Sequence, residues 1–200
     1  MPKPQNDTNI TDIKICKDEH PRNPLVKRIL ALLVPRGDKK IFESVSDMLE
    51  ELWGKPERIS RFYPFVWTNY YEDISHELDR CFFSYPGLYP FSKLPDWKNA
   101  TCALEKRTGE SRKVNLDPGT IDGARLVLAS TKGQAHRIYL HDGIFAEVTL
   151  CRRKGRWENF FYTFPDFKSG VYDVWLESVR EDWKKLHNQL NITCHYVSEN

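Results

Sequence analysis

The sequence predicts a single α+β domain, in which helices pack on one face of a mostly antiparallel sheet. A chain of 200 residues is long enough to bury one core. Near the N-terminus the apolar pattern changes from a strand to a helix and then to two strands, and an amphipathic helix over residues 169–190 closes the chain. Strand, helix, strand, strand is also how a ferredoxin-like fold begins, so we expect the domain to start with such a half.

The domain is expected to span residues 25–190. Residues 1–24 contain four prolines among polar residues, and this composition buries too little apolar surface to offset the entropy lost on ordering. We interpret them as a flexible N-terminal tail, and residues 191–200 as a C-terminal tail.

Hydrophobic spacing and turn residues predict the first two elements. Residues 28–34 form an apolar run that ends at Pro35 and Gly37, as expected of a buried strand that enters a turn. Apolar residues at three-to-four spacing over 41–53 predict a helix on a core, and Gly54 ends it.

The middle of the chain is rich in aromatic and β-branched residues. Residues 57–67 and 80–85 predict two strands, and residues 92–107 predict a helix with Ser92 as its N-cap. Residues 120–129 fit either a short helix or a buried strand, and both interpretations stay open.

A β-hairpin follows, and its register can be predicted because a shift of one residue turns every side chain to the other face. A three-residue loop over 141–143 pairs Leu140 with Ile144 and Arg137 with Glu147. The apolar residues Ile138, Leu140, Ile144, Ala146, Val148 and Leu150 then share one face, and Arg137, Tyr139, Glu147 and Thr149 share the other.

The balance of charge excludes a strong overall attraction to polyanions. Thirty basic and 28 acidic residues leave a formal net charge of +2, so nucleic acid is an unlikely partner. The basic run at 152–156 fits a solvated hairpin turn around Gly155 better than a nucleic-acid surface.

The five cysteines are widely spaced and form no Cys-x-x-Cys pair, so we expect reduced thiols and no metal site. No apolar run is long enough for a membrane span and no apolar signal core begins the chain, which predicts a cytoplasmic protein without a membrane partner.

The segment 115–119, Asn-Leu-Asp-Pro-Gly, is interpreted first as a turn. The alternative is a functional loop in which Asn115 and Asp117 present their oxygen atoms to a ligand.

Polar residues gather between Val114 and Leu150, as in a binding site, although no phosphate loop is present. Lys132, His136 and Arg137 suit an anion, and a sheet face without a helix would present them. The candidate binding residues are Asn115, Asp117, Lys132, His136, Arg137, Tyr139, Glu147 and Asp166.

The leading hypothesis is therefore the binding of an anionic small molecule, phosphorylated or nucleotide-like. Two other classes remain open: an enzyme that uses the same residues as acid, base and anion clamp, and a protein-interaction module with exposed aromatic residues. The sequence identifies no cofactor and no oligomeric state.

Several segments, in this order, resemble an uncharacterised family, the domain of unknown function DUF4416. They are residues 65–72, 115–119, 128–132, 136–140, 143–150 and 163–167. The resemblance covers most of residues 26–185 and implies a prokaryotic, cytoplasmic single domain without an established activity. Val66 departs from the family pattern, which usually has an acidic residue there.

Overall fold

The computed structural model describes residues 24–68, 70–109 and 111–197, with side chains described up to residue 190. The expected N-terminal tail lies outside this part except for Pro24, whose carbonyl oxygen accepts a hydrogen bond from the amide of Phe91.

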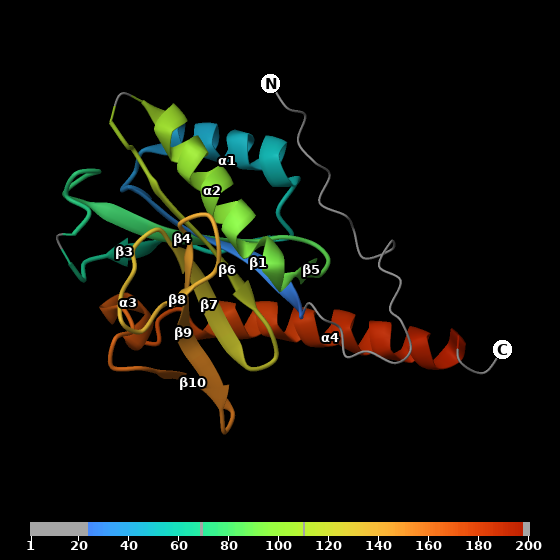
Figure 1. The fold of residues 1–200 in the computed structure, drawn as a ribbon. Coiled ribbons are helices and arrows are strands. Elements are labelled where there is room, and N and C mark those ends of the chain that lie inside the picture. The colour runs from blue at the N-terminus through green and yellow to red at the C-terminus, as the bar shows by residue number, and fades with distance from the viewer. Residues whose placement is uncertain (1–23, 69, 110, 198–200) are drawn as a thin grey trace.

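One antiparallel sheet organises the described residues, in the order β10-β9-β7-β6-β1-β4-β2 with β3, β5 and β8 attached beside this path (Figure 1). The strands are β1 (Leu25–Pro35), β2 (Arg58–Ile59), β3 (Tyr63–Phe65), β4 (Leu78–Ser84), β5 (Tyr89–Pro90), β6 (Asn115–Ile121), β7 (Arg125–Ser130), β8 (Ile138–Tyr139), β9 (Phe145–Arg153) and β10 (Arg156–Asn159). The α-helices are α1 (Lys39–Trp53), α2 (Leu94–Glu105), α3 (Pro165–Lys168) and α4 (Asp173–Val197), and the short 3₁₀ helices are η2 (Phe91–Lys93) and η3 (Lys106–Thr108).

The part of the chain from β1 to β6 has the ferredoxin-like arrangement. Strand β1 lies between β4 and β6, and the short strands β2 and β3 pair with the outer side of β4. Helix α1 connects β1 to β2 and α2 precedes β6, which completes a β-α-β-β-α-β unit. The α+β class and the expected beginning are therefore confirmed, and β7, β9 and β10 extend the sheet past β6.

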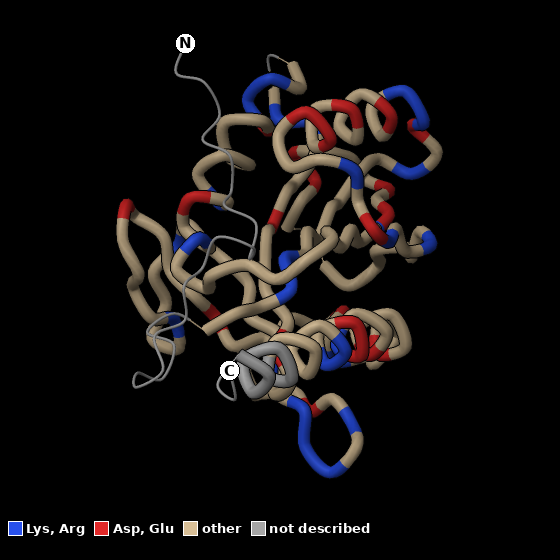
Figure 2. The backbone as a smooth tube through the Cα atoms, turned by 90° about the vertical axis from the view of Figure 1, so that its right-hand side faces the viewer, with Lys and Arg blue, Asp and Glu red and all other residues tan. Residues whose placement is uncertain are grey.

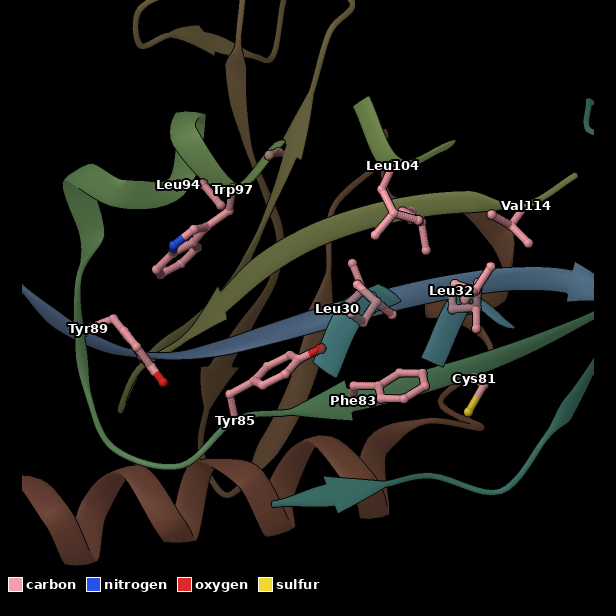
Figure 3. Packing of buried hydrophobic residues seen from close by; sticks show 14 of the residues in the cluster. Leu30, Leu32, Cys81, Phe83, Tyr85, Tyr89, Leu94, Trp97, Leu104 and Val114 are labelled. Atoms are coloured by element: carbon pink, nitrogen blue, oxygen red, sulfur yellow. The ribbon is translucent and has the colours of Figure 1, made fainter. Parts of the chain in front are cut away.

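Helices cover both faces of the sheet, whereas the sequence predicted one covered face. Leu30 and Leu32 of β1 point into a cluster with α1 and α2 (Figure 3), and Ile29 and Ala31 point into a second cluster with α3 and α4. Figure 1 shows α4 running along the face opposite to α1 and α2. The reason is that β1 is apolar at consecutive positions, so both of its faces need a cover.

The register predicted for the hairpin is confirmed. Ile138 pairs with Ala146 and Tyr139 pairs with Phe145, and the amide of Leu140 donates to the carbonyl oxygen of Ile144 at 2.9 Å. This register places Arg137 opposite Glu147, as expected. The predicted apolar face is wrong at its end: Ala146 and Val148 pack in the cluster with α1 and α2, whereas Leu150 packs in the cluster with α4, because the pairing of β7 with β9 shifts between Leu126 and Val127.

The strand expected over 57–67 is interrupted at Ser60. The hydroxyl of Ser60 accepts a hydrogen bond from the amide of Phe82 at 2.9 Å, while its own amide donates to the carbonyl oxygen of Phe82 at 2.8 Å. This local bonding separates β2 from β3.

Residues 115–119 are not a turn or a loop but the beginning of the central strand β6, so both sequence interpretations of their conformation were wrong. Pro118 is tolerated because β6 pairs with β7 only from Gly119 onward, which leaves the earlier part without a second partner strand. Gly119 is needed for a close approach, since a Cβ atom there would lie 2.6 Å from Leu128 Cδ2 and from the carbonyl oxygen of Val127.

Other expected boundaries shift as well. Residues 125–130 form strand β7, which resolves the ambiguity over 120–129. The N-cap position of α2 is Lys93 and not Ser92, and α4 extends past residue 190 into the expected C-terminal tail.

Within the described part of the chain, no helix is long and apolar enough to cross a membrane.

Candidate functional site

A cavity of about 240 Å³ lies where β6 and β7 separate, and both strands line it. Asn115 and Asp117 pair in register with Leu33 and Ala31 of β1, whose side chains lie on the α4 face of the sheet. The α4 face therefore supplies part of the lining, whereas Lys98, Cys102 and Glu105 belong to α2, which covers the opposite face.

A connected polar network forms one wall of the cavity. The ammonium group of Lys98, from α2, donates to the carbonyl oxygen of Leu116 and to Asp117 Oδ1, both at 2.8 Å. Asn115 Nδ2 donates to Asp117 Oδ2 at 2.6 Å, and Arg112 Nη1 donates to Asn115 Oδ1 at 3.2 Å. Both oxygen atoms of Asp117 are thereby occupied, which fixes this carboxylate.

A buried ion pair lies beside that network. Arg80 of β4 is 3% exposed and lines the cavity, and its Nη2 donates to Oδ2 of Asp166, which is 0% exposed, at 3.1 Å. Tyr172 donates to the same oxygen at 3.2 Å. Arg80 Nε and Nη1 have no hydrogen-bond partner among the described residues. The guanidinium carbon lies 5.2 Å from the ring centre of Phe65 and 5.8 Å from that of Phe167, so aromatic faces hold the group in place.

The opposite wall is organised around Glu147. Its Oε2 atom is 2.8 Å from Arg137 Nε and 3.0 Å from His136 Nε2, and Arg137 Nη1 donates to the Ser130 hydroxyl at 2.8 Å. The His136 ring stacks on Tyr162 at 4.2 Å between ring centres. His136 and Arg137 thus hold the carboxylate of Glu147 in place.

Lys132 stands apart from these pairs. Its ammonium group lies 4.3 Å from the ring centre of Tyr70, and no carboxylate within the described part of the chain pairs with it. Tyr70 in turn meets Tyr71 edge to face at 4.9 Å. All three residues line the cavity.

Opposite charges keep the buried groups ionised. Burial alone would raise the pKa of Asp117, but Lys98 and Arg80 hold that pKa below its ordinary value. Burial would likewise lower the pKa of Lys98, and Asp117 and Glu105 raise it instead. Burial raises the pKa of Glu105, which also accepts a hydrogen bond from the amide of Leu116.

The structure brings most of the candidate residues together. Those that line the cavity are Asn115, Asp117, Lys132, Arg137 and Glu147. His136 and Asp166 do not line it but bind lining residues from behind. Tyr139 does not reach the cavity: it is 57% exposed and packs against Phe145.

The sequence analysis missed Arg80, Lys98, Glu105 and Arg112. The sequence did carry a signal for Arg80, Lys98 and Glu105, because each of these charged residues interrupts an apolar pattern. Arg80 is an inward position of the apolar strand β4, and Lys98 and Glu105 belong to the buried side of α2. Charges at core positions need partners or a function.

The described residues offer no metal centre. No group of three or more His, Cys, Asp or Glu residues within them is arranged to hold a metal ion. Cys81, Cys102 and Cys151 are free thiols, and Cys16 lies outside the described residues. Cys102 lines the cavity, where burial raises its pKa and so disfavours the thiolate.

The basic run at 152–156 forms the turn between β9 and β10, as expected. Lys154 and Gly155 have φ angles of 47° and 80°, and Glu158 pairs with both Arg153 and Arg156. Figure 2 shows this basic hairpin at the bottom of the molecule.

Comparison with known proteins adds one relationship. No curated protein and no solved structure matches the chain. The model of a domain of unknown function, DUF4416, matches residues 24–183. Because this match covers most of the 200 residues, and includes every residue that lines the cavity, the chain belongs to the DUF4416 family.

Proposed function

We propose that the protein binds an anionic small molecule in the cavity between β6 and β7. Cationic side chains from four separate parts of the chain line it: Arg80, Lys98, Arg112, Lys132 and Arg137. The proposal keeps the prokaryotic and cytoplasmic setting that the family resemblance implies, where phosphorylated metabolites are abundant.

The observation that carries the proposal is the state of Arg80. Its guanidinium is buried and charged, but only one of its three nitrogen atoms has a hydrogen-bond partner among the described residues. A buried polar group without a partner costs about 1–3 kcal/mol, and more when it is charged. An anion that enters the cavity would supply the missing acceptors after a small shift of the guanidinium.

Lys132, which also lines the cavity, supports the same conclusion. Its charge is exposed and is not neutralised by a carboxylate of the described residues, so it is available to an incoming anion. Lys98 has used two of its three N–H donors on Leu116 and Asp117, which leaves one.

Isothermal titration calorimetry with inorganic phosphate and simple phosphate monoesters tests the proposal. We expect saturable binding to the wild-type protein and roughly tenfold weaker binding to Lys132→Ala, since a charge-assisted hydrogen bond contributes about 1.5–3 kcal/mol. Lys185→Ala is the matched control, because Lys185 is an exposed lysine of α4 that does not line the cavity.

Two results would overturn the proposal. One is the absence of binding by every anion at millimolar concentration. The other is equal weakening in Lys132→Ala and Lys185→Ala, which would mean that binding depends only on the overall charge.

A further inference from the structure

We infer that the ligand is a small phosphate monoester that carries free hydroxyl groups, with its phosphate towards Arg80 and Lys132 and a hydroxyl donating to Glu147. This inference rests on the proposed function and names the class of ligand for that site. The inference comes from the lining groups that lack a hydrogen-bond or ion-pair partner. Arg80 and Lys132 are donors, and Glu147 is an acceptor.

The unused donors suit a phosphate group. Arg80 has two unpartnered nitrogen atoms that are enclosed and would meet a phosphate after the small shift of the guanidinium described above. Lys132 has an exposed ammonium group without a carboxylate partner in the described part of the chain. A phosphate monoester offers three strong acceptor oxygens and about two negative charges near neutral pH. A carboxylate offers two oxygens and one charge, and would leave more of these donors unsatisfied.

The unused acceptor, an oxygen atom of Glu147, suits a hydrogen-bond donor on the same ligand. Both hydrogen bonds that Glu147 accepts from His136 and Arg137 go to Oε2. Its Oε1 atom has no donor among the described residues and is not one of the enclosed unpartnered atoms. Since Glu147 is 7% exposed and lines the cavity, this oxygen is an acceptor presented to whatever fills it.

Charge decides where each part of the ligand lies. A phosphate beside Glu147 would face its carboxylate, whereas beside Arg80 and Lys132 it faces two cations. A hydroxyl group is neutral and donates one hydrogen bond, so it can satisfy Glu147 without repulsion. The ligand therefore has a charged end and a hydroxylated end.

The volume of the cavity limits the size of this ligand. A cavity of about 240 Å³ holds several water molecules, so a lone phosphate ion leaves part of it empty. The volume is also below the range of about 300–1,000 Å³ that is typical of pockets for drug-sized ligands. The volume therefore favours a monoester of a few carbon atoms over a whole nucleotide.

Two probes of equal length isolate the hydroxyl groups. Glycerol 3-phosphate and propyl phosphate have the same number of carbon atoms and the same phosphate, and differ in their hydroxyls. By calorimetry we expect glycerol 3-phosphate to bind the wild-type protein about tenfold more tightly or better. Inorganic phosphate should bind more weakly than glycerol 3-phosphate, and so should glycerate, in which a carboxylate replaces the phosphorylated CH2 group.

Variants at Glu147 assign the preference to a residue. In Glu147→Gln the ratio of the dissociation constants of propyl phosphate and glycerol 3-phosphate should fall to about twofold or less, because a neutral amide replaces the charged acceptor and hydrogen bonds to neutral groups are weaker. The ratio cancels any general loss of affinity or of folded protein. Glu147→Asp keeps the charge, but its side chain is one CH2 group shorter and places the carboxylate farther from the ligand. This variant should therefore lower the ratio as well. Glu158→Gln, a change on β10 outside the cavity, should leave the ratio unchanged.

The possible failures are distinguishable. Equal affinity for glycerol 3-phosphate and propyl phosphate, or tighter binding of glycerate, overturns the inference and leaves anion binding in place. A preference that persists in both Glu147 variants also overturns it. If none of the four anions binds, the proposed function fails together with the inference.

Discussion

Arg80 and Asp166, which are separated by 86 residues in sequence, form an ion pair at 3.1 Å beside the cavity, with side chains that are 3% and 0% exposed. The pair joins β4 to α3, two segments of opposite halves of the chain. It holds a charge at the wall of the cavity that the surrounding apolar residues could not hold alone.

The first prediction concerns this pair. Asp166→Leu should lower the free energy of unfolding by about 3–5 kcal/mol, because it leaves the charge of Arg80 buried and unpaired. The double variant Arg80→Met/Asp166→Leu should be more stable than Asp166→Leu, since no uncompensated charge remains. Urea unfolding measures both. Arg36→Ala is the control, because Arg36 makes a more exposed ion pair with Asp79 of the same strand and should cost less than ~1 kcal/mol.

A double variant as unstable as Asp166→Leu would contradict this account of the pair. It would mean that packing around Arg80, rather than its charge, dominates the stability of this region.

The second prediction concerns the pH dependence that Asp117 confers. Its pKa in the folded protein is below the ordinary value of 3.8, so its contribution to stability is complete above that value and is lost as the pH falls through the folded pKa. The stability difference between wild type and Asp117→Asn should be largest near neutral pH and should shrink below about pH 3.8. Urea unfolding at several pH values measures it. A difference that stays constant with pH would show that the charge of Asp117 is not what Lys98 stabilises.

The third prediction concerns Gly119. In Gly119→Ala the new methyl group would lie 2.6 Å from Leu128 Cδ2 and from a backbone oxygen of β7, which cannot move freely. We expect a loss of about 1–3 kcal/mol of stability, as for other overpacked sites, measured by urea unfolding. An Ala variant as stable as wild type would contradict the close approach of β6 and β7 at this position.

The fourth prediction concerns Arg28, whose side chain is 1% exposed on the face of α1 and α2. Its guanidinium carbon lies 4.2 Å from the ring centre of Tyr89 and 4.7 Å from that of Trp53. Arg28→Ala removes these contacts and leaves a void between the rings, so the loss of stability should exceed ~2 kcal/mol. A thermal melt measures it, and Arg61→Ala is the control because Arg61 is exposed and lies over one ring only.

The sequence predicts those parts of the fold that depend on local patterns. The hairpin register around Arg137 and Glu147 was predictable because only one pairing separates apolar from polar side chains there. The face of Leu150 was not, because the irregular pairing of β7 with β9 depends on a strand outside the hairpin. The helix over 41–53 was predictable for the same reason, since its apolar residues lie on one side.

Long-range contacts could not be predicted in this way. Asn115 to Gly119 has the residues of a turn, but pairing with β1 makes it a strand, and pairing partners far along the chain leave no local signal. Arg80 was missed because its partner, Asp166, becomes its neighbour only in the folded protein. The prediction of one open face also failed, although consecutive apolar residues such as those of β1 are typical of a strand that is buried on both faces. The second face is covered by α4, which lies far from β1 in the sequence.

The central claim is that the cavity between β6 and β7 binds an anion, and a crystal structure with glycerol 3-phosphate tests it most directly. The account predicts electron density for a phosphate within hydrogen-bond distance of Arg80 and Lys132, with a hydroxyl group beside Glu147 Oε1. A cavity that holds only water while the monoester is bound at another surface would contradict it.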